Sequence, residues 1–235
     1  MRINKYLSSC GVASRRKCDD LIKSGVVKIN GKVLTELGYD VKEDIDQVTV
    51  RSKPMKATEQ FVYYKLNKPK GYVCTTDDEK NRRTVMDLMR GVKTRIFPVG
   101  RLDYDTEGLL ILTNDGDIAN KIMKPSSEIG KTYVVKIDEN ISKEEIDILT
   151  KGVDIDGYIT RDCNVDVFES NSEGTRLEIT IFEGKNRQIR KMFEKIEKNI
   201  TYLKRISIGK IKLGGLSRGE YTTLNKKELD YLRSL

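Results

Sequence analysis

The 235-residue sequence contains no histidine and no tryptophan, and it has only four prolines and four cysteines. The absence of histidine excludes Ser-His-Asp and Cys-His catalysis, zinc sites with imidazole ligands, and imidazole acid–base chemistry. An enzyme built from this chain must therefore use carboxylates, Lys, Arg, Tyr, Ser, Thr or Cys. Asp and Glu become the first candidates for catalysis.

The four cysteines form no Cys-x-x-Cys pair, which argues against a structural zinc site or a disulfide framework. We expect them to be reduced thiols that pack as small apolar groups. No apolar stretch approaches the roughly 20 residues that cross a bilayer, and the polar N-terminus lacks the apolar core of a signal peptide. We therefore expect a cytoplasmic protein without a membrane partner. The sequence does not decide the oligomeric state, for which a monomer is the default.

Positive charge is concentrated in two parts of a chain whose net charge is +8. Residues 1–33 hold eight Lys and Arg against two Asp, and residues 184–218 hold eleven against two Glu, so the remaining chain is net negative. Two basic segments on an acidic body are typical of a protein that binds a polyanion. The alternative is an ordinary charged surface.

The first basic segment has the pattern of a helix followed by a hairpin. Ser14 is a suitable N-cap for a helix that ends at Gly25, and residues 26–33 form two short strand-like runs joined by Asn30-Gly31. The first helical turn carries three cations, which the helix dipole disfavours by a few tenths of a kcal/mol each. The pattern predicts a phosphate site there, unless these charges are simply exposed.

Residues 1–50 resemble the S4 RNA-binding domain, through Met1–Leu7, Ser14-Arg15-Arg16 and Val27–Lys32. The resemblance implies structured RNA as a partner and does not by itself imply a reaction. The cations that we expect to contact RNA in this domain are Arg2, Lys5, Arg15, Arg16, Lys17 and Lys32.

Residues 51–60 are polar and without periodicity, as expected for a linker. In residues 61–235 we predict strands over Phe61–Leu66, Tyr72–Thr75, Arg95–Val99, Gly108–Thr113, Thr132–Ile137, Asp162–Phe168, Arg176–Phe182 and Leu203–Lys212. We predict helices from Ser142 to about Thr150, over Asn186–Lys198, and from Asn225 to Leu235. Strands do not alternate regularly with helices, so we expect an α+β catalytic domain with a mainly antiparallel mixed sheet.

An acidic loop stands out in this basic chain: Asp103, Asp105 and Glu107 lie just before an apolar run. Two Asp residues can simply shape a turn. The segment from Asp103 to Gly108 also matches the first six positions of a calcium loop. The twelfth position should be a bidentate Glu but is Asn114, so the residues argue against a metal site.

The same segment resembles the signature of the rRNA pseudouridine synthases, in Gly100-Arg101-Leu102-Asp103, Gly108-Leu109-Leu110 and Thr113-Asn114-Asp115-Gly116. Further motifs of that family follow the family's order along the chain: Asn67–Gly71, Lys131-Thr132-Tyr133, Glu183–Met192, and Leu203–Ile206 with Gly209. With the S4-like segment, the resemblance covers the whole sequence.

This resemblance implies isomerisation of uridine to pseudouridine, without metal or cofactor. The essential carboxylate maps to Asp103, as nucleophile or general base. Its basic partner maps to Arg190, with Lys185 the less favoured candidate, and the aromatic residue that stacks on the flipped uracil maps to Tyr133. The alternative for Tyr133 is a core aromatic.

The resemblance also suggests which cations bind RNA near the carboxylate. Arg101 would contact the phosphate of the flipped nucleotide or fill the gap that it leaves, and Lys68, Lys185 and Arg187 would hold the RNA backbone. The alternative is a solvated surface.

Within the family, the segment after Asn114, the context of Tyr133 and the end near Tyr231–Arg233 are most similar to the enzymes that modify 23S rRNA. A 16S rRNA enzyme shares every motif named above and remains an alternative. A non-catalytic rRNA-binding or ribosome-assembly factor and, more weakly, a metal-dependent nuclease are the alternatives from other classes.

Overall fold

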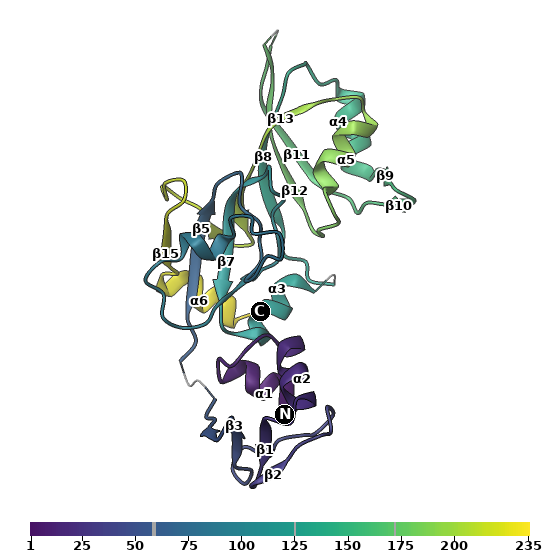
Figure 1. Cartoon of the computed structure of the whole chain (residues 1–235). Helices are drawn as coiled ribbons and strands as arrows, with labels where there is room; N and C mark the ends of the chain where they lie inside the picture. The colour runs from purple at the N-terminus through teal and green to yellow at the C-terminus, as the bar shows by residue number, and fades with distance from the viewer. Residues whose placement is uncertain (58–59, 125, 172) are drawn as a thin grey trace. The chain divides into compact units, whose positions relative to one another are not determined.

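The computed structural model describes residues 1–57, 60–124, 126–171 and 173–235. The chain forms two compact units, Met1–Val62 with Lys93–Arg95 and Tyr63–Val92 with Ile96–Leu235 (Figure 1). Residues 58 and 59 of the predicted linker lie outside the described residues. None of the helices in the described parts of the chain has the length and apolar composition that crossing a lipid bilayer requires.

The first unit contains two helices and a four-stranded antiparallel sheet in the order β2-β1-β3-β4. Its elements are α1 (Ile3–Ser9), α2 (Arg15–Lys23), β1 (Val27–Ile29), β2 (Lys32–Val33), β3 (Val48–Val50) and β4 (Lys53–Pro54). The apolar faces of both helices and of β1 and β3 are buried in one core. The predicted hairpin is confirmed, because β1 pairs with β2 across Asn30 and Gly31, both at positive φ.

The predicted start of the second helix is also confirmed. The Ser14 side chain accepts a hydrogen bond from the backbone N–H of Lys17 at 3.3 Å. The sequence did not predict α1, and it assigned Lys53–Pro54 to the linker. That short strand pairs with β3 through Thr49 and Val50, because the left-handed turn at Arg51 and Ser52 returns the polar chain to the sheet edge.

The second unit is an α+β fold around a mixed, mainly antiparallel sheet, as predicted, and the described residues contribute nine strands to it. Its main path runs β11-β12-β8-β13-β7-β5-β15, with β14 on β13 and β6 on β7, and only β13 and β7 pair in parallel among the described strands. The strands are β5 (Tyr63–Lys68), β6 (Phe97–Val99), β7 (Glu107–Thr113), β8 (Lys131–Ile137), β11 (Asn164–Asn171), β12 (Gly174–Ile181), β13 (Ile200–Ile208), β14 (Ile211–Lys212) and β15 (Tyr221–Thr223). A separate hairpin consists of β9 (Asp154–Ile155) and β10 (Tyr158–Ile159).

The helical elements of this unit are η1 (Val85–Leu88), α3 (Gly116–Met123), α4 (Lys143–Lys151), α5 (Gln188–Lys195) and α6 (Lys226–Arg233). The capping boxes predicted at Ser142 and Asn225 are present, with Glu145 and Glu228 as partners. The sequence missed α3, although its N-cap Asp115 accepts bonds from two backbone N–H groups at 3.0 and 3.1 Å.

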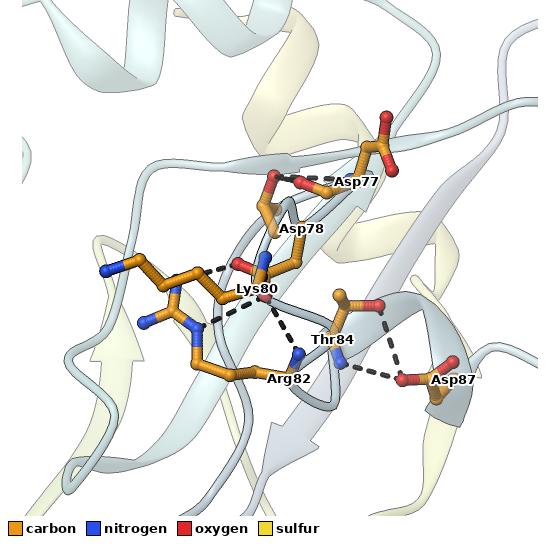
Figure 2. Close-up of polar contacts among 7 residues, drawn as sticks. Asp77, Asp78, Lys80, Arg82, Thr84 and Asp87 are labelled. Atoms are coloured by element: carbon orange, nitrogen blue, oxygen red, sulfur yellow. Dashed lines mark hydrogen bonds and ion pairs between the residues drawn. The ribbon is translucent and has the colours of Figure 1, made fainter.

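The strand predicted over Tyr72–Thr75 is wrong. Val73 forms only an isolated bridge to Thr84, and the polar loop between them is held by its own side chains (Figure 2). The Arg82 guanidinium donates to both carboxylate oxygens of Asp78, at 2.6 and 3.2 Å, and lowers the pKa of that carboxyl to about 2. These contacts favour a compact loop over an extended strand.

Strand β7 lies inside the sheet, between β13 and β5, and is buried along its whole length. Leu109 and Ile111 of β7 share one apolar core with residues of α3 and α6. These two helices therefore pack beside β7 (Figure 1). The burial of β7 fixes the point at which the preceding chain enters the sheet. The acidic loop is that entering chain.

Candidate active site

The loop that carries Asp103 joins β6 to β7, and a buried ammonium group fixes its backbone. The Lys68 Nζ donates hydrogen bonds to the carbonyl oxygens of Pro69, Asp103 and Thr106 at 3.2, 3.0 and 2.9 Å. Burial lowers the pKa of this ammonium group below its usual range. Lys68 is 0% exposed, so the prediction that it holds the RNA backbone is not met. The structure makes Lys68 a clamp on the acidic loop instead.

The Asp103 carboxylate, in contrast, is free to meet a ligand. The residue is partly exposed, and no described group donates a hydrogen bond to its carboxylate or forms an ion pair with it. Asp103 lines a cleft of ≈ 580 Å³ together with Tyr133, Arg190 and Arg205. A fixed backbone with an unpaired carboxylate is suited to nucleophilic or general-base chemistry.

The predicted pairing of Asp103 with Arg190 is not found. The Arg190 Nη2 lies 3.2 Å from Oδ2 of Asp105 and donates to the Asp105 carbonyl oxygen at 3.3 Å. Arg187 approaches the same carboxylate at 3.5 Å. Asp105 therefore attaches the loop to the start of α5, because two residues of that segment contact it. Arg190 still lines the cleft together with Asp103.

The third acid of the loop, Glu107, is the first residue of β7. Glu107 is 4% exposed, and its Oε2 lies 3.1 Å from Nη2 of Arg218. The three acids therefore have three environments, which does not fit a calcium loop. Among the described residues, no group of three or more Cys, Asp or Glu side chains is placed to hold a metal ion.

Tyr133 lies on β8, next to a buried arginine that the sequence did not single out. Arg205 on β13 is directly opposite Tyr133 in the register, and its Nη1 lies 3.4 Å from the Tyr133 hydroxyl. The Arg205 Nε donates to the carbonyl oxygen of Leu109 at 2.7 Å, and the residue is 3% exposed. The motif Leu203–Ile206, which contains Arg205, matched the family's late strand in the sequence, but no role was predicted for Arg205.

A glycine allows β7 and β13 to meet at this point. Gly108 has φ +109°, and a Cβ there would lie 2.1 Å from the carbonyl oxygen of Arg205. Any side chain would separate the two strands, which pair only at Lys204–Glu107 and Arg205–Gly108. The Gly108 position thus connects the acidic loop to the strand that carries Arg205.

The remaining predicted cations differ in exposure and contacts. Arg101, Lys185 and Arg187 are exposed and line the cleft, as RNA contacts require. The Lys185 Nζ lies 3.9 Å from the Tyr158 ring centroid, a cation–π contact, rather than beside Asp103. These exposed cations give the cleft that Asp103 lines a positive charge.

In the first unit, Arg15, Arg16, Lys17 and Lys32 are exposed. Arg15 donates to the side chain of Asn4 at 3.3 Å, and Lys5 is partly buried. Arg2 donates to the Gly38 carbonyl and lies 3.8 Å from Asp40, so it holds that loop as well as facing solvent. Arg15, Arg16 and Lys17 form an exposed basic cluster at the start of α2.

The model of the RNA pseudouridylate synthase family matches residues 62–195, and the S4 domain model matches residues 1–44. The chain belongs to the RNA pseudouridine synthase family. It is similar to ribosomal large subunit pseudouridine synthase B of Bacillus subtilis, with 42% identity covering 100% of this chain and 96% of that protein. It is also similar to the dual-specificity RNA pseudouridine synthase RluF of Escherichia coli K12, with 38% identity over 97% of this chain and 77% of that one.

A solved structure agrees with this membership. A crystal structure of a pseudouridylate synthase matches with a TM-score of 0.72 and 26% identity, covering 99% of each chain. The enzyme therefore combines an S4 domain with a pseudouridine synthase unit, as the sequence predicted.

We expect Asp105→Asn to lower the turnover rate of this pseudouridine synthase about 10-fold at unchanged RNA affinity, because the loop loses its anchor to Arg190. Single-turnover kinetics with a filter-binding assay separate the two effects. The matched control is Asp156→Asn. It removes the exposed partner of Lys191, which lies on α5 as Arg190 does, and should leave the rate unchanged. Equal rates for Asp105→Asn and the wild type would show that this anchor is dispensable.

Proposed function

We propose that this protein converts a uridine of large-subunit rRNA to pseudouridine in the cytoplasm, as a monomer, with Asp103 as the catalytic carboxylate. The observation that carries the proposal is the unpaired Asp103 carboxylate at a cleft lined by Tyr133 and Arg190, on a loop held by the buried Lys68. The large-subunit assignment is supported by the full-length similarity to ribosomal large subunit pseudouridine synthase B.

The target uridine must leave its stack before a carboxylate can reach its ribose. The cleft of ≈ 580 Å³ has room for one nucleotide, and Tyr133 supplies an aromatic surface for the base, a contact worth about 1–3 kcal/mol. The exposed Arg101, Lys185 and Arg187 hold the phosphates on either side. Asp103 then acts on the ribose or the base from a fixed position.

Mapping of pseudouridine by carbodiimide primer extension in a gene-deletion strain tests this function. The proposal expects one pseudouridine signal in 23S rRNA to vanish on deletion and to return with the wild-type gene. A signal that vanishes from 16S rRNA instead would overturn the large-subunit assignment. An unchanged set of signals in both rRNAs would support a non-catalytic assembly factor.

The S4 domain should contribute affinity more than chemistry. Replacing Arg15, Arg16 and Lys17 by Ala removes exposed charges at one helix end, so RNA affinity should fall about 10-fold or more at low salt and depend less steeply on salt concentration. The rate at saturating RNA should change little. A parallel loss of rate at saturation would mean that this domain also positions the target nucleotide.

A further inference from the structure

We propose that Lys131 and Arg205 form an anion-receiving floor of the cleft, which stabilises the negative charge on uracil while its bond to ribose is broken. The inference rests on the proposed function and adds two residues to its site. Both line the cleft, Lys131 as a partly exposed side chain and Arg205 as a buried one.

The sheet places these residues together. Lys131 and Tyr133 are two apart on β8 and so share one face, and Arg205 pairs with Tyr133 across β13. All three line the cleft. The Arg205 guanidinium carbon lies 6.0 Å from the centroid of the Tyr133 ring. A base on that ring would therefore lie beside both cations.

Both cations lack an acidic partner. No described carboxylate forms an ion pair with either, and the buried Nη2 of Arg205 has no hydrogen-bond partner among the described groups. Lys131 donates one bond, to the Ile129 carbonyl oxygen at 3.3 Å. Glu183 is the carboxylate whose charge acts on Lys131. It already accepts hydrogen bonds from the Tyr158 hydroxyl, the Gln188 amide and the backbone N–H of Arg161.

Such an arrangement costs folding free energy until a negative charge arrives. Burial and then the charge of Arg205 lower the pKa of the Lys131 ammonium group. An anionic group bound above Lys131 would reverse this penalty. The floor of the cleft is thus complementary to negative charge, which is the electrostatic requirement for a transition state that develops it.

The base fits this position better than a phosphate does. The phosphates of a flipped nucleotide remain on the RNA backbone, where the exposed Arg101, Arg161 and Lys185 line the cleft. Only the extruded base reaches the buried floor beside Tyr133. Arg205 is 3% exposed, so a backbone phosphate would have to enter the protein to approach it.

The chemistry requires an anion at this point. When the bond from C1′ to N1 breaks, its electron pair stays on N1, and uracil carries one negative charge shared by N1, O2 and O4. C1′ is left with the matching positive charge, as an oxocarbenium ion, or is held as an ester of the Asp103 carboxylate, which leaves when C5 attacks. The charge is consumed when C5 forms its bond to C1′. The proton on C5 then leaves and N1 takes up a proton, so substrate and product have the same atoms and charge.

A comparison of two substrates tests the proposal: unmodified 23S rRNA transcribed with uridine or with 5-fluorouridine, whose fluorine already stabilises the base anion. Lys131→Gln should slow single-turnover formation of the C-glycoside about 100-fold on uridine RNA, but less than about 10-fold on 5-fluorouridine RNA. Chromatography with mass spectrometry measures the product. On 5-fluorouridine RNA this product is a C-glycoside that keeps its fluorine at C5 and takes up water at C6, because no C5 proton can leave. Arg205→Gln should show the same difference, and Lys131→Arg should restore most of the rate.

The matched control is Arg161→Gln, which removes an exposed cation from the same cleft and should slow both substrates equally. Equal losses for Lys131→Gln on both RNAs, in a variant with wild-type melting temperature, would overturn the proposal. So would a loss confined to affinity and its salt dependence, which would indicate a phosphate site, or a folded Lys131→Arg variant as slow as Lys131→Gln. Wild-type protein inactive on uridine RNA would instead refute the proposed function.

Discussion

Asp103→Asn should reduce pseudouridine formation at least about 1,000-fold while leaving RNA affinity within a factor of two, because the amide is neither a nucleophile nor a base. No described group donates to the carboxylate in the free protein, so the exchange breaks no hydrogen bond or ion pair and should change the melting temperature little. Release of tritium from RNA labelled at uracil C5 measures the rate.

Asp103→Glu is the companion variant. It keeps the charge but moves the carboxylate by one methylene group, and a misplacement of about 1 Å can cost about 100-fold in rate. We therefore expect activity between that of the wild type and that of Asp103→Asn. A wild-type rate for Asp103→Asn would show that Asp103 is not the catalytic carboxylate, and Asp105 would become the next candidate.

Lys68→Met should be the most damaging change outside the cleft. It removes the ammonium donor to two carbonyl oxygens of the acidic loop, those of Asp103 and Thr106, and to the carbonyl oxygen of Pro69, at a cost of about 2–4 kcal/mol in the free energy of unfolding. Because the Asp103 backbone is one of those partners, the rate should also fall about 100-fold. Denaturant unfolding and single-turnover kinetics measure the two effects.

Lys65→Met provides the control on the same strand. Lys65 is a partly buried lysine that pairs with Glu228 at 2.7 Å and does not touch the acidic loop. Its loss should lower stability and leave the rate of the folded protein unchanged. If Lys68→Met behaved in the same way, with lower stability but normal turnover, the loop would not need this clamp to present Asp103.

The family, the α+β class and most strands could be predicted from the sequence. The order of the motifs and the pattern of apolar residues can both be read along the chain without knowing which distant segments are in contact. Lys68 illustrates what could not be predicted from the sequence. In the sequence it is one cation of a basic motif, and only the pairing of β5 with β7 places it under the loop, where burial replaces solvent exposure.

Long-range pairing also explains the other two differences. The sequence could not distinguish which of two nearby carboxylates, Asp103 or Asp105, faces Arg190, because they are two residues apart and the start of α5 is about 80 residues away. Arg205 had no predicted role because its environment arises from β7, β8 and β13 together.

The most direct test of the central claim uses the purified full-length protein and an unmodified 23S rRNA transcript in excess EDTA, followed by carbodiimide mapping. The account predicts pseudouridine at one position, at close to one per RNA molecule, and none with Asp103→Asn at the same protein concentration. Pseudouridine formed equally by both proteins, or by neither on naked transcript and on ribosomal particles alike, would contradict it.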